Sequence, residues 1–266
     1  MLLFVVHPAS AGTTVDRAPS LQVVAIIPAR FASSRFPGKP LADIDGHPMI
    51  EHVYRRARSC AAVTRVIVAT DDLRIADAVR RFDGEVRLTR DDHRSGTDRL
   101  AEVAASLHCD VVVNVQGDEP LIDPGAMTEA VAPLAGDPSL PMTTLYRRIE
   151  NPAEVSDPNV VKIALDRGGF ALYFSRAAIP YVRDPRGGWP PFFKHIGLYA
   201  YRRSTLMVLG ALEPTPLERA ESLEQLRALE HGIRIKAVET AYDSIGVDTP
   251  EDLEAVRRLL GTPMSG

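Results

Sequence analysis

The sequence predicts an α/β fold in which a doubly wound, mainly parallel sheet has acquired a strand-rich insertion. Two observations support this prediction. From Gln22 onward, short β-branched runs alternate with helical patterns, as they do in βαβ units. Strand signals then follow one another closely between about residues 141 and 202, with few helical patterns among them. An α/β core interrupted by a strand-rich insertion fits this order.

The first half of the chain predicts strands that are buried on both faces by helices. The expected strands are Val23–Ile27, Arg65–Ala69 and Val111–Val115, and each is nearly continuous in apolar residues. Helices are expected at Pro48–Cys60, where the proline suits a first turn, and at Asp72–Phe82. The apolar side of the second helix would consist of Leu73, Ala76, Val79 and Phe82.

The insertion and the C-terminal elements are predicted from the second half of the chain. A helix is expected at Pro216–Glu230, a strand at Ile233–Val238 and a final helix from Pro250. The loop Arg183–Pro191 is rich in proline and glycine and has no periodic pattern, so it could act as a lid. The strands expected in the insertion are Thr143–Tyr146, Val160–Leu165, Phe170–Phe174 and Ile196–Tyr201.

No repeat or linker divides the chain, so residues 21–266 are expected to form a single domain. Residues 1–20 have a short apolar run without the basic start of a secretory signal, and we interpret them as a flexible N-terminal extension. No later stretch approaches the roughly 18 to 20 apolar residues that span a bilayer. Membrane insertion is therefore not expected.

Composition limits the class of ligand. The 266 residues have a net charge of -4 and a pI near 6.0, which excludes the broad basic surface of a nucleic-acid-binding protein. Any phosphate that the protein binds should therefore be small. Cys60 and Cys109 lie in different segments without a metal-like pairing, so neither a disulfide framework nor a zinc site is indicated. The cytoplasm is the expected compartment.

The loop after the first strand is the most informative segment. Pro28–Leu41 contains the cations Arg30, Arg35 and Lys39 together with two serines and a glycine. Ligands of open parallel sheets bind beyond the carboxyl ends of the strands, so this loop lies where a nucleotide would bind. Its backbone donors and positive charge suit a triphosphate, although the spacing is not that of a Walker loop. The alternative is a solvated basic turn.

Two aspartates are candidate ligands of magnesium. Asp118 follows the strand that ends at Val115, beside a glycine that permits close backbone approach. Asp248 precedes the final helix, and because Thr249 can cap that helix alone, Asp248 is free to face a site. Mg²⁺ takes one or two protein carboxylates and completes its coordination with water and phosphate. The alternatives are a turn residue for Asp118 and a helix-start residue for Asp248.

A polar loop, Arg90–Leu100, leads into another predicted helix. Ser95 or Thr97 would cap this helix, and its exposed N–H groups could meet an anion or the edge of a base. His93 taken alone is more often a surface histidine than a catalyst.

The helix expected at Pro216–Glu230 offers acceptor side chains on one face. At about 100° per residue, Glu218, Glu221 and Gln225 fall within roughly 60° of one another, opposite Leu223. Such acceptors suit a polyol. The alternative is an ordinary amphipathic helix with a solvated acidic face.

From about Val23 to Leu260 the chain resembles the 3-deoxy-manno-octulosonate (Kdo) cytidylyltransferase family. The matching strings follow one another in order over nearly the whole chain, and together they are highly specific. They are Pro28-Ala29-Arg30, Arg35–Pro40, Ser95–Glu102, Asn114–Pro120, Ala171–Arg176, His195-Ile196-Gly197, Leu223–Arg227 and Gly246–Pro250.

The resemblance implies both an architecture and a reaction. The doubly wound, mainly parallel sheet would bind the nucleotide, the inserted strand-rich subdomain would bind the sugar, and the protein would form a homodimer. The enzyme would transfer CMP from CTP to the anomeric hydroxyl of Kdo, an acidic ulosonic-acid sugar, and release pyrophosphate for lipopolysaccharide biosynthesis. Mg²⁺ would be the cofactor.

The resemblance also implies roles for individual residues. Nucleotide binding would fall to Ala29, Arg30, Arg35, Lys39, Ser95, Gly96, Thr97 and Asp118. The catalytic residues would be Arg35 and Lys39, which neutralise the β and γ phosphates, and Asp118 and Asp248, which bind magnesium. The sugar would be bound by Arg99, Gln116, His195, Tyr199, Glu218, Glu221 and Gln225, with Arg176 at its rim.

Two other classes of function remain as alternatives. Another sugar nucleotidyltransferase, acting on neuraminate or on a hexose phosphate, would share the fold, but a hexose-phosphate enzyme would be expected to begin with a glycine-rich loop in place of Pro28-Ala29-Arg30. A non-catalytic nucleotide sensor has no need for both aspartates, Lys39 and an acceptor-rich sugar site.

Overall fold

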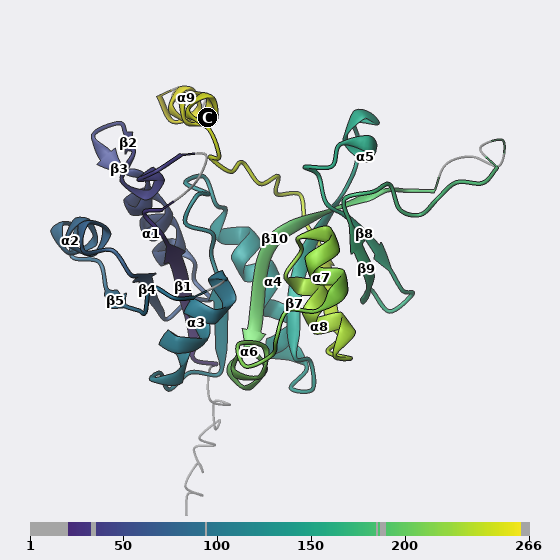
Figure 1. Ribbon diagram of the computed structural model, residues 1–266, viewed down its shortest axis with the longest axis horizontal. Coiled ribbons are helices and arrows are strands. Elements are labelled where there is room, and N and C mark those ends of the chain that lie inside the picture. Colours follow the sequence, from purple (N-terminus) through teal and green to yellow (C-terminus); the bar gives the residue numbers. More distant parts are fainter. Residues whose placement is uncertain (1–20, 33–35, 94, 185, 187–189, 262–266) are drawn as a thin grey trace, which may run out of the picture.

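The computed structural model describes residues 21–32, 36–93, 95–184, 186 and 190–261 (Figure 1). A nine-stranded sheet runs through the molecule, and its main path is β11-β7-β10-β6-β1-β4-β5. The expected fold class is therefore confirmed. The predicted extension at residues 1–20 lies outside the described residues, as do Arg35 and part of the predicted lid loop.

Three strands of the parallel half of the sheet lie where the sequence predicts them, and β5 is an additional strand that it does not predict. Its strands are β1 (Val23–Ala29), β4 (Arg65–Thr70), β5 (Val86–Leu88) and β6 (Val111–Asn114), paired in the order β6-β1-β4-β5. The central strands are buried on both faces, because alternate residues of β1 belong to different core clusters. This burial explains why their sequences are nearly continuously apolar.

Helices cover both faces of this half, as in a doubly wound fold. One face packs against α1 (Met49–Ser59), α2 (Leu73–Arg81) and α4 (Pro124–Gly136). The other packs against α3 (Gly96–Ala105), α6 (Arg203–Leu209) and α8 (Gln225–Glu230).

Two details of the predicted helices are wrong. Pro48 is the N-cap of α1 and has extended backbone angles, so it precedes the first turn. Leu73, placed on the apolar side of α2, is 62% exposed, because the buried side of that helix consists of Ile75, Ala76, Ala78 and Val79. Asp72 caps α2 by accepting a hydrogen bond from the backbone of Arg74, so the helix starts at Leu73.

The predicted insertion does contain four strands, but they do not form a sheet of their own. Strands β7 (Met142–Arg148) and β10 (Phe193–Arg202) extend the central sheet, with β10 antiparallel to both β6 and β7. The hairpin of β8 (Lys162–Leu165) and β9 (Ala171–Ser175) then pairs with the start of β10. The last strand, β11 (Ile235–Glu239), pairs in parallel with β7.

The single helix expected at Pro216–Glu230 is also wrong. The chain forms two short helices, α7 (Pro216–Glu221) and α8, because Ser222 adopts a left-handed conformation with φ 53° between them. A helix cannot continue through such a residue. Glu218, Glu221 and Gln225 therefore do not share one helical face.

The final helix packs against elements from the first quarter of the chain. Helix α9 (Pro250–Gly261) lies near the hairpin of β2 (Asp43–Ile44) and β3 (His47–Pro48), at one end of the molecule (Figure 1). Leu253 and Val256 of α9 share a small core cluster with Ile44 and Met49. The remaining short elements are a 3₁₀ turn at Lys39–Leu41 and α5 (Ala153–Ser156).

Candidate active site

Two cavities lie side by side at the carboxyl end of β6. The first, which we call the loop cavity, has a volume of about 390 Å³ and follows the end of β1. Its lining consists of Pro28, Ala29, Arg30, Ala32, Lys39, Pro40, Gly96, Gln116, Gly117 and Asp118. This is the edge of the sheet where an open parallel fold binds ligands.

Close backbone packing shapes the loop cavity. A Cβ atom added to Gly117 would lie 2.7 Å from the carbonyl oxygen of Pro28, so only glycine lets the turn after β6 approach the end of β1. Gly38 has φ 73° and precedes the turn that presents Lys39. Both glycines therefore help to bring a cation and a carboxylate into the same cavity.

Lys39 lies between the two predicted metal ligands. Its Nζ atom is 2.7 Å from Oδ2 of Asp118 and 3.3 Å from Oδ1 of Asp248. The Lys39 side chain is only 12% exposed, whereas the carboxylates are 34% and 48% exposed. The structure thus brings these three residues together from the first loop, the middle of the chain and the start of α9.

The start of α9 is capped without the side chain of Asp248. Thr249 Oγ1 accepts a hydrogen bond from the backbone of Asp252, and Asp252 in turn accepts from the backbone of Asp248 and Thr249. The side chain of Asp248 therefore does not serve as the cap and contacts Lys39 instead. A backbone hydrogen bond of 2.8 Å from Val247 to the carbonyl of Asp118 holds the two segments together.

This donor set fits a magnesium ion. Two carboxylates from separate segments converge on one cationic atom, and Mg²⁺ uses one or two protein carboxylates together with water and phosphate. No group of three or more histidine, cysteine, aspartate or glutamate side chains suited to a metal occurs in the part of the chain that the structure describes. The arrangement suits a hard cation that is completed by a ligand and disfavours a structural zinc site.

A buried carboxyl group lies directly behind Asp118. Burial raises the pKa of Glu119 to about 7, and the charge of Asp118 adds to this shift. The hydroxyl of Tyr242 donates to Glu119 over 3.3 Å, and Ser244 also hydrogen-bonds this carboxyl. These contacts tie the turn after β6 to the loop that leads to Asp248.

The second cavity, which we call the strand cavity, is smaller, about 230 Å³, and lies over β6 and β10. Gln116 lines both cavities, so they adjoin. Four of the residues predicted to bind the sugar, Gln116, His195, Tyr199 and Gln225, line the strand cavity. Its other lining residues are Thr97, Asn114, Met142, Gly197, Tyr201, Leu209, Leu223, Glu224, Arg227 and Ala228.

His195 is a neutral hydrogen-bonding group in this cavity. Burial lowers its pKa to about 3, and its Nε2 atom lies 2.8 Å from the hydroxyl of Thr144. Its ring packs against Phe174 and Tyr199, with centroids 4.9 and 5.3 Å away. A register shift in β10 at Ile196–Tyr199 exposes the carbonyl of Gly197, which accepts a hydrogen bond from Gln116.

Three residues predicted to bind the sugar do not line either cavity. Arg99 is fully buried and contacts Asp71 and Thr89 instead. Glu218 is bound to Arg227, and Glu221 accepts hydrogen bonds from the side chain of Ser175 and the backbone of Arg176. The break at Ser222 explains why Glu218 and Glu221 do not line the strand cavity. It separates the direction of α7 from that of α8, and only residues after the break line the cavity.

The start of α3 contributes to both cavities. Ser95 and Asp98 form a capping box, so the side chain of Ser95 satisfies the helix end. Gly96 lines the loop cavity, and the next residue, Thr97, lines the strand cavity. Arg30 and Ala29, which are predicted to bind the nucleotide, line the loop cavity, whereas Arg35 lies outside the described residues.

The sequence predictions missed four polar residues that line the strand cavity: Asn114, Tyr201, Glu224 and Arg227. Burial raises the pKa of Glu224, to which the hydroxyls of Ser95 and Thr97 donate hydrogen bonds. Among the described residues, its Oε1 atom and Oδ1 of Asn114 have no hydrogen-bond partner and are buried. Glu224 and Asn114 both occur in the matching strings, but a helix that runs unbroken from Pro216 to Glu230 favours Glu218 and Glu221 instead.

Similarity to known proteins covers most of the chain. Residues 24–235 match the family model described as cytidylyltransferase. A 3-deoxy-manno-octulosonate cytidylyltransferase of Solibacter usitatus is 55% identical over 90% of this chain and 94% of its own length. The protein of the same name from Geobacter sulfurreducens is 55% identical over 89% and 98%.

Solved structures agree. A CMP:2-keto-3-deoxy-manno-octonic acid synthetase complexed with CTP superposes with a TM-score of 0.86 and 48% identity, over 90% of this chain and 98% of that one. A 4-diphosphocytidyl-2C-methyl-D-erythritol synthase from Anaerococcus prevotii, with a TM-score of 0.58 and 15% identity over 91% and 100%, shares the fold alone. None of the helices within the described ranges is long and apolar enough to cross a membrane. By its sequence, its sheet and the relatives that it matches over nearly their full length, this chain belongs to the 3-deoxy-manno-octulosonate cytidylyltransferase family.

Proposed function

We propose that this protein transfers CMP from CTP to the anomeric hydroxyl of Kdo and releases pyrophosphate. One observation supports the proposal above the others: Gln116 lines both cavities, so a site with cationic and carboxylate groups adjoins a site suited to a polyol. A triphosphate and a sugar bound there would be neighbours. The relative that superposes over most of the chain was solved with CTP bound.

The loop cavity would hold the nucleotide. Lys39 and Arg30 supply positive charge for the phosphates, and Arg35 is proposed to add to it on the basis of the sequence. The open N–H groups at the start of α3, beside Gly96, suit an anion or the edge of the base. Because a nucleotide and an ulosonate are both anionic, neutralising charge and aligning the two reactants must supply much of the rate.

Magnesium is proposed as the cofactor, held by Asp118 and Asp248. When bound, it would neutralise phosphate charge and make the sugar hydroxyl easier to deprotonate. Lys39 now balances the two carboxylates and would be drawn toward the phosphates once a second cation is present.

The strand cavity would hold the sugar. Gln116, Gln225, Tyr199 and the unpartnered oxygens of Glu224 and Asn114 can hydrogen-bond several hydroxyl groups, and His195 does so without charge. Among the described residues, neither serine nor cysteine lines the two cavities. Direct displacement by the sugar hydroxyl is therefore favoured over a covalent intermediate on the protein.

A homodimer and a cytoplasmic location are also proposed, on the family resemblance. With a net charge of -4, the chain has no broad basic surface for a nucleic-acid backbone, so the substrates are proposed to be small molecules. Light scattering in solution would test the dimer, which should have twice the 29.0 kDa mass of the chain.

Pyrophosphate release tests the reaction itself. The assay contains CTP and magnesium with one of four acceptors: Kdo, 8-amino-Kdo, neuraminate or glucose-1-phosphate. Release with Kdo supports the proposal. Release only with another acceptor would change the proposed sugar substrate but leave the fold and the proposed nucleotide site as they are. CTP binding without release from any acceptor would favour the nucleotide sensor.

A further inference from the structure

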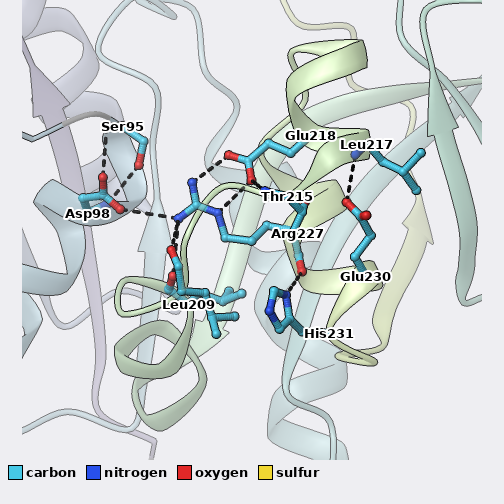
Figure 2. A network of polar contacts seen from close by, with 10 residues as sticks. Ser95, Asp98, Leu209, Thr215, Leu217, Glu218, Arg227, Glu230 and His231 are labelled. Carbon is cyan, nitrogen blue, oxygen red and sulfur yellow. Dashed lines mark hydrogen bonds and ion pairs between the residues drawn. The ribbon is translucent and has the colours of Figure 1, made fainter.

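Arg227 lies at a junction of three segments that surround the strand cavity. Figure 2 shows its guanidinium between Glu218 of α7, Asp98 of α3 and the carbonyls at the end of α6. The Nε and Nη2 atoms donate to the two carboxylate oxygens of Glu218 over 2.9 and 2.6 Å. Nη1 donates to the carbonyl of Leu212 over 3.1 Å and lies 3.7 Å from Oδ1 of Asp98.

These contacts form in a largely dry environment. The side chain of Arg227 is 4% exposed, that of Glu218 12% and that of Asp98 19%. A two-pronged Arg–carboxylate pair fixes orientation as well as distance. Arg227 thus sets the position of α7 and α8 relative to the start of α3.

Arg227 is linked to both cavities, through Asp98 on one side and through its own helix on the other. Asp98 uses its other oxygen to accept from the backbone of Ser95, and so orders the turn that places Gly96 in the loop cavity and Thr97 in the strand cavity. On the opposite side, Glu224 and Gln225 of the strand cavity come just before Arg227 in the chain, and the backbone of Arg227 donates to the carbonyl of Glu224.

We propose that Arg227 is a positioning residue that couples the two substrate sites. By holding Asp98 and Glu218 together, it fixes α8, whose first turn lines the strand cavity, to the turn that would contact the nucleotide. Occupancy of one cavity then favours binding in the other, and the coupling is reciprocal. The inference rests on the proposed function, because it assigns the nucleotide to the loop cavity and the sugar to the strand cavity.

The test measures the dissociation constant of Kdo by calorimetry with and without saturating α,β-methylene-CTP and magnesium. The ratio of the two constants is the coupling. Asp98→Asn is the main variant, because an asparagine oxygen can still accept from Ser95 while the charge facing Arg227 is removed. Glu218→Gln is the second variant, and it weakens the pair on the other side of Arg227.

Two further variants serve as controls. Asp98→Glu retains the charge and gives the Ser-x-x-Glu capping box, so it should restore the coupling. Glu85→Gln weakens a matched two-pronged pair with Arg65, over 2.7 and 2.6 Å, at residues that line neither cavity. It should leave the coupling unchanged.

In the wild type, the nucleotide analogue is expected to tighten Kdo binding by about 10-fold or more, within the usual range of coupling. Asp98→Asn should lower this ratio by about 5-fold and change Kdo binding alone by less than ~2-fold. A wild-type ratio of one, an unchanged ratio in both variants, or equal loss in Glu85→Gln would overturn the inference.

Failure of the proposed function gives a different pattern. A wild-type protein that neither binds Kdo nor releases pyrophosphate with it overturns the function, and the inference with it. Normal pyrophosphate release by the wild type, together with an unchanged coupling ratio in both Asp98→Asn and Glu218→Gln, overturns only the role of Arg227.

Discussion

Lys39 is in contact with two carboxylates that a bound cation would share. Replacing Asp118 or Asp248 by asparagine removes one charged ligand and one partner of Lys39. We expect each variant to lose ~100-fold or more in kcat, because metal-ion stabilisation of developing charge contributes several kcal/mol. Pyrophosphate release measures the loss.

The fold of these variants should remain intact, since a partly exposed ion pair contributes about 0–1 kcal/mol. Their melting temperatures should therefore stay close to that of the wild type. Asp77→Asn is the matched control, because Asp77 pairs with Arg80 over 2.7 Å on the exposed side of α2. An active Asp248→Asn enzyme would reduce Asp248 to a helix-start residue.

His195 provides a prediction about pH. Burial lowers its pKa from 6.5 to about 3, so between these values the unfolded chain binds more protons than the folded one. The contribution of His195 to stability is present above pH 6.5 and falls as the pH drops through this window. From pH 7 to pH 5 the loss should be about 2 kcal/mol.

Urea unfolding of the wild type and of His195→Gln at both pH values measures this contribution. Glutamine can hydrogen-bond Thr144 but does not titrate, so the variant should lack this part of the pH dependence. Equal dependence in the two proteins would show that His195 is not the group responsible.

The sequence predicts the residues of the loop cavity better than those of the strand cavity. Lys39, Asp118 and Asp248 follow or precede predicted elements that end at the same edge of the sheet, and topology alone brings them together. The positions of Glu218 and Arg99 depend instead on buried partners, Arg227 and Asp71, that no local pattern reveals.

Among the elements, the pair of short helices α7 and α8 depends on one backbone conformation. Ser222 has φ 53° and ψ 48°, a left-handed conformation that disfavours β-branched residues in particular. Ser222→Val should cost about 1–2 kcal/mol in the free energy of unfolding. It should also raise the KM for the sugar, because Glu224 and Gln225 follow the break and line the strand cavity.

Ser222→Gly is the control for this variant, because glycine adopts the left-handed region without strain. Denaturant unfolding and sugar-dependent kinetics should show near-normal values for the glycine variant. A valine variant as stable and active as the glycine variant would mean that the break does not determine the position of α8.

Strands were predicted more accurately than the helices around the strand cavity. Burial on both faces leaves β1, β4 and β6 with continuous apolar runs, a signal that does not depend on distant partners. A single helix through Ser222 is predicted because the hydrophobic periodicity continues across this residue. A hydrophobic pattern does not reveal a left-handed backbone conformation. Likewise, strand signals alone could not show that β7 and β10 join the central sheet.

For the whole molecule, the proposed cofactor gives the clearest expectation. Chelation with EDTA should abolish pyrophosphate release, and excess Mg²⁺ should restore it. Without the metal ion, the negative charges of the phosphates, Asp118 and Asp248 would repel one another. Circular dichroism should show an unchanged fold, since the core clusters are apolar and do not include these aspartates. Activity that persists after complete chelation would contradict magnesium dependence.

The pairing of Lys39 with Asp248 also has a consequence for synthesis of the protein. The two residues are 209 positions apart, so the ribosome delivers the lysine long before its second carboxylate. The small core around Ile44 and Met49 is likewise incomplete until Leu253 and Val256 of α9 have been synthesised. A chain that has not yet added α9 can therefore pair the described strands of the sheet while the proposed metal site and this small core are still incomplete.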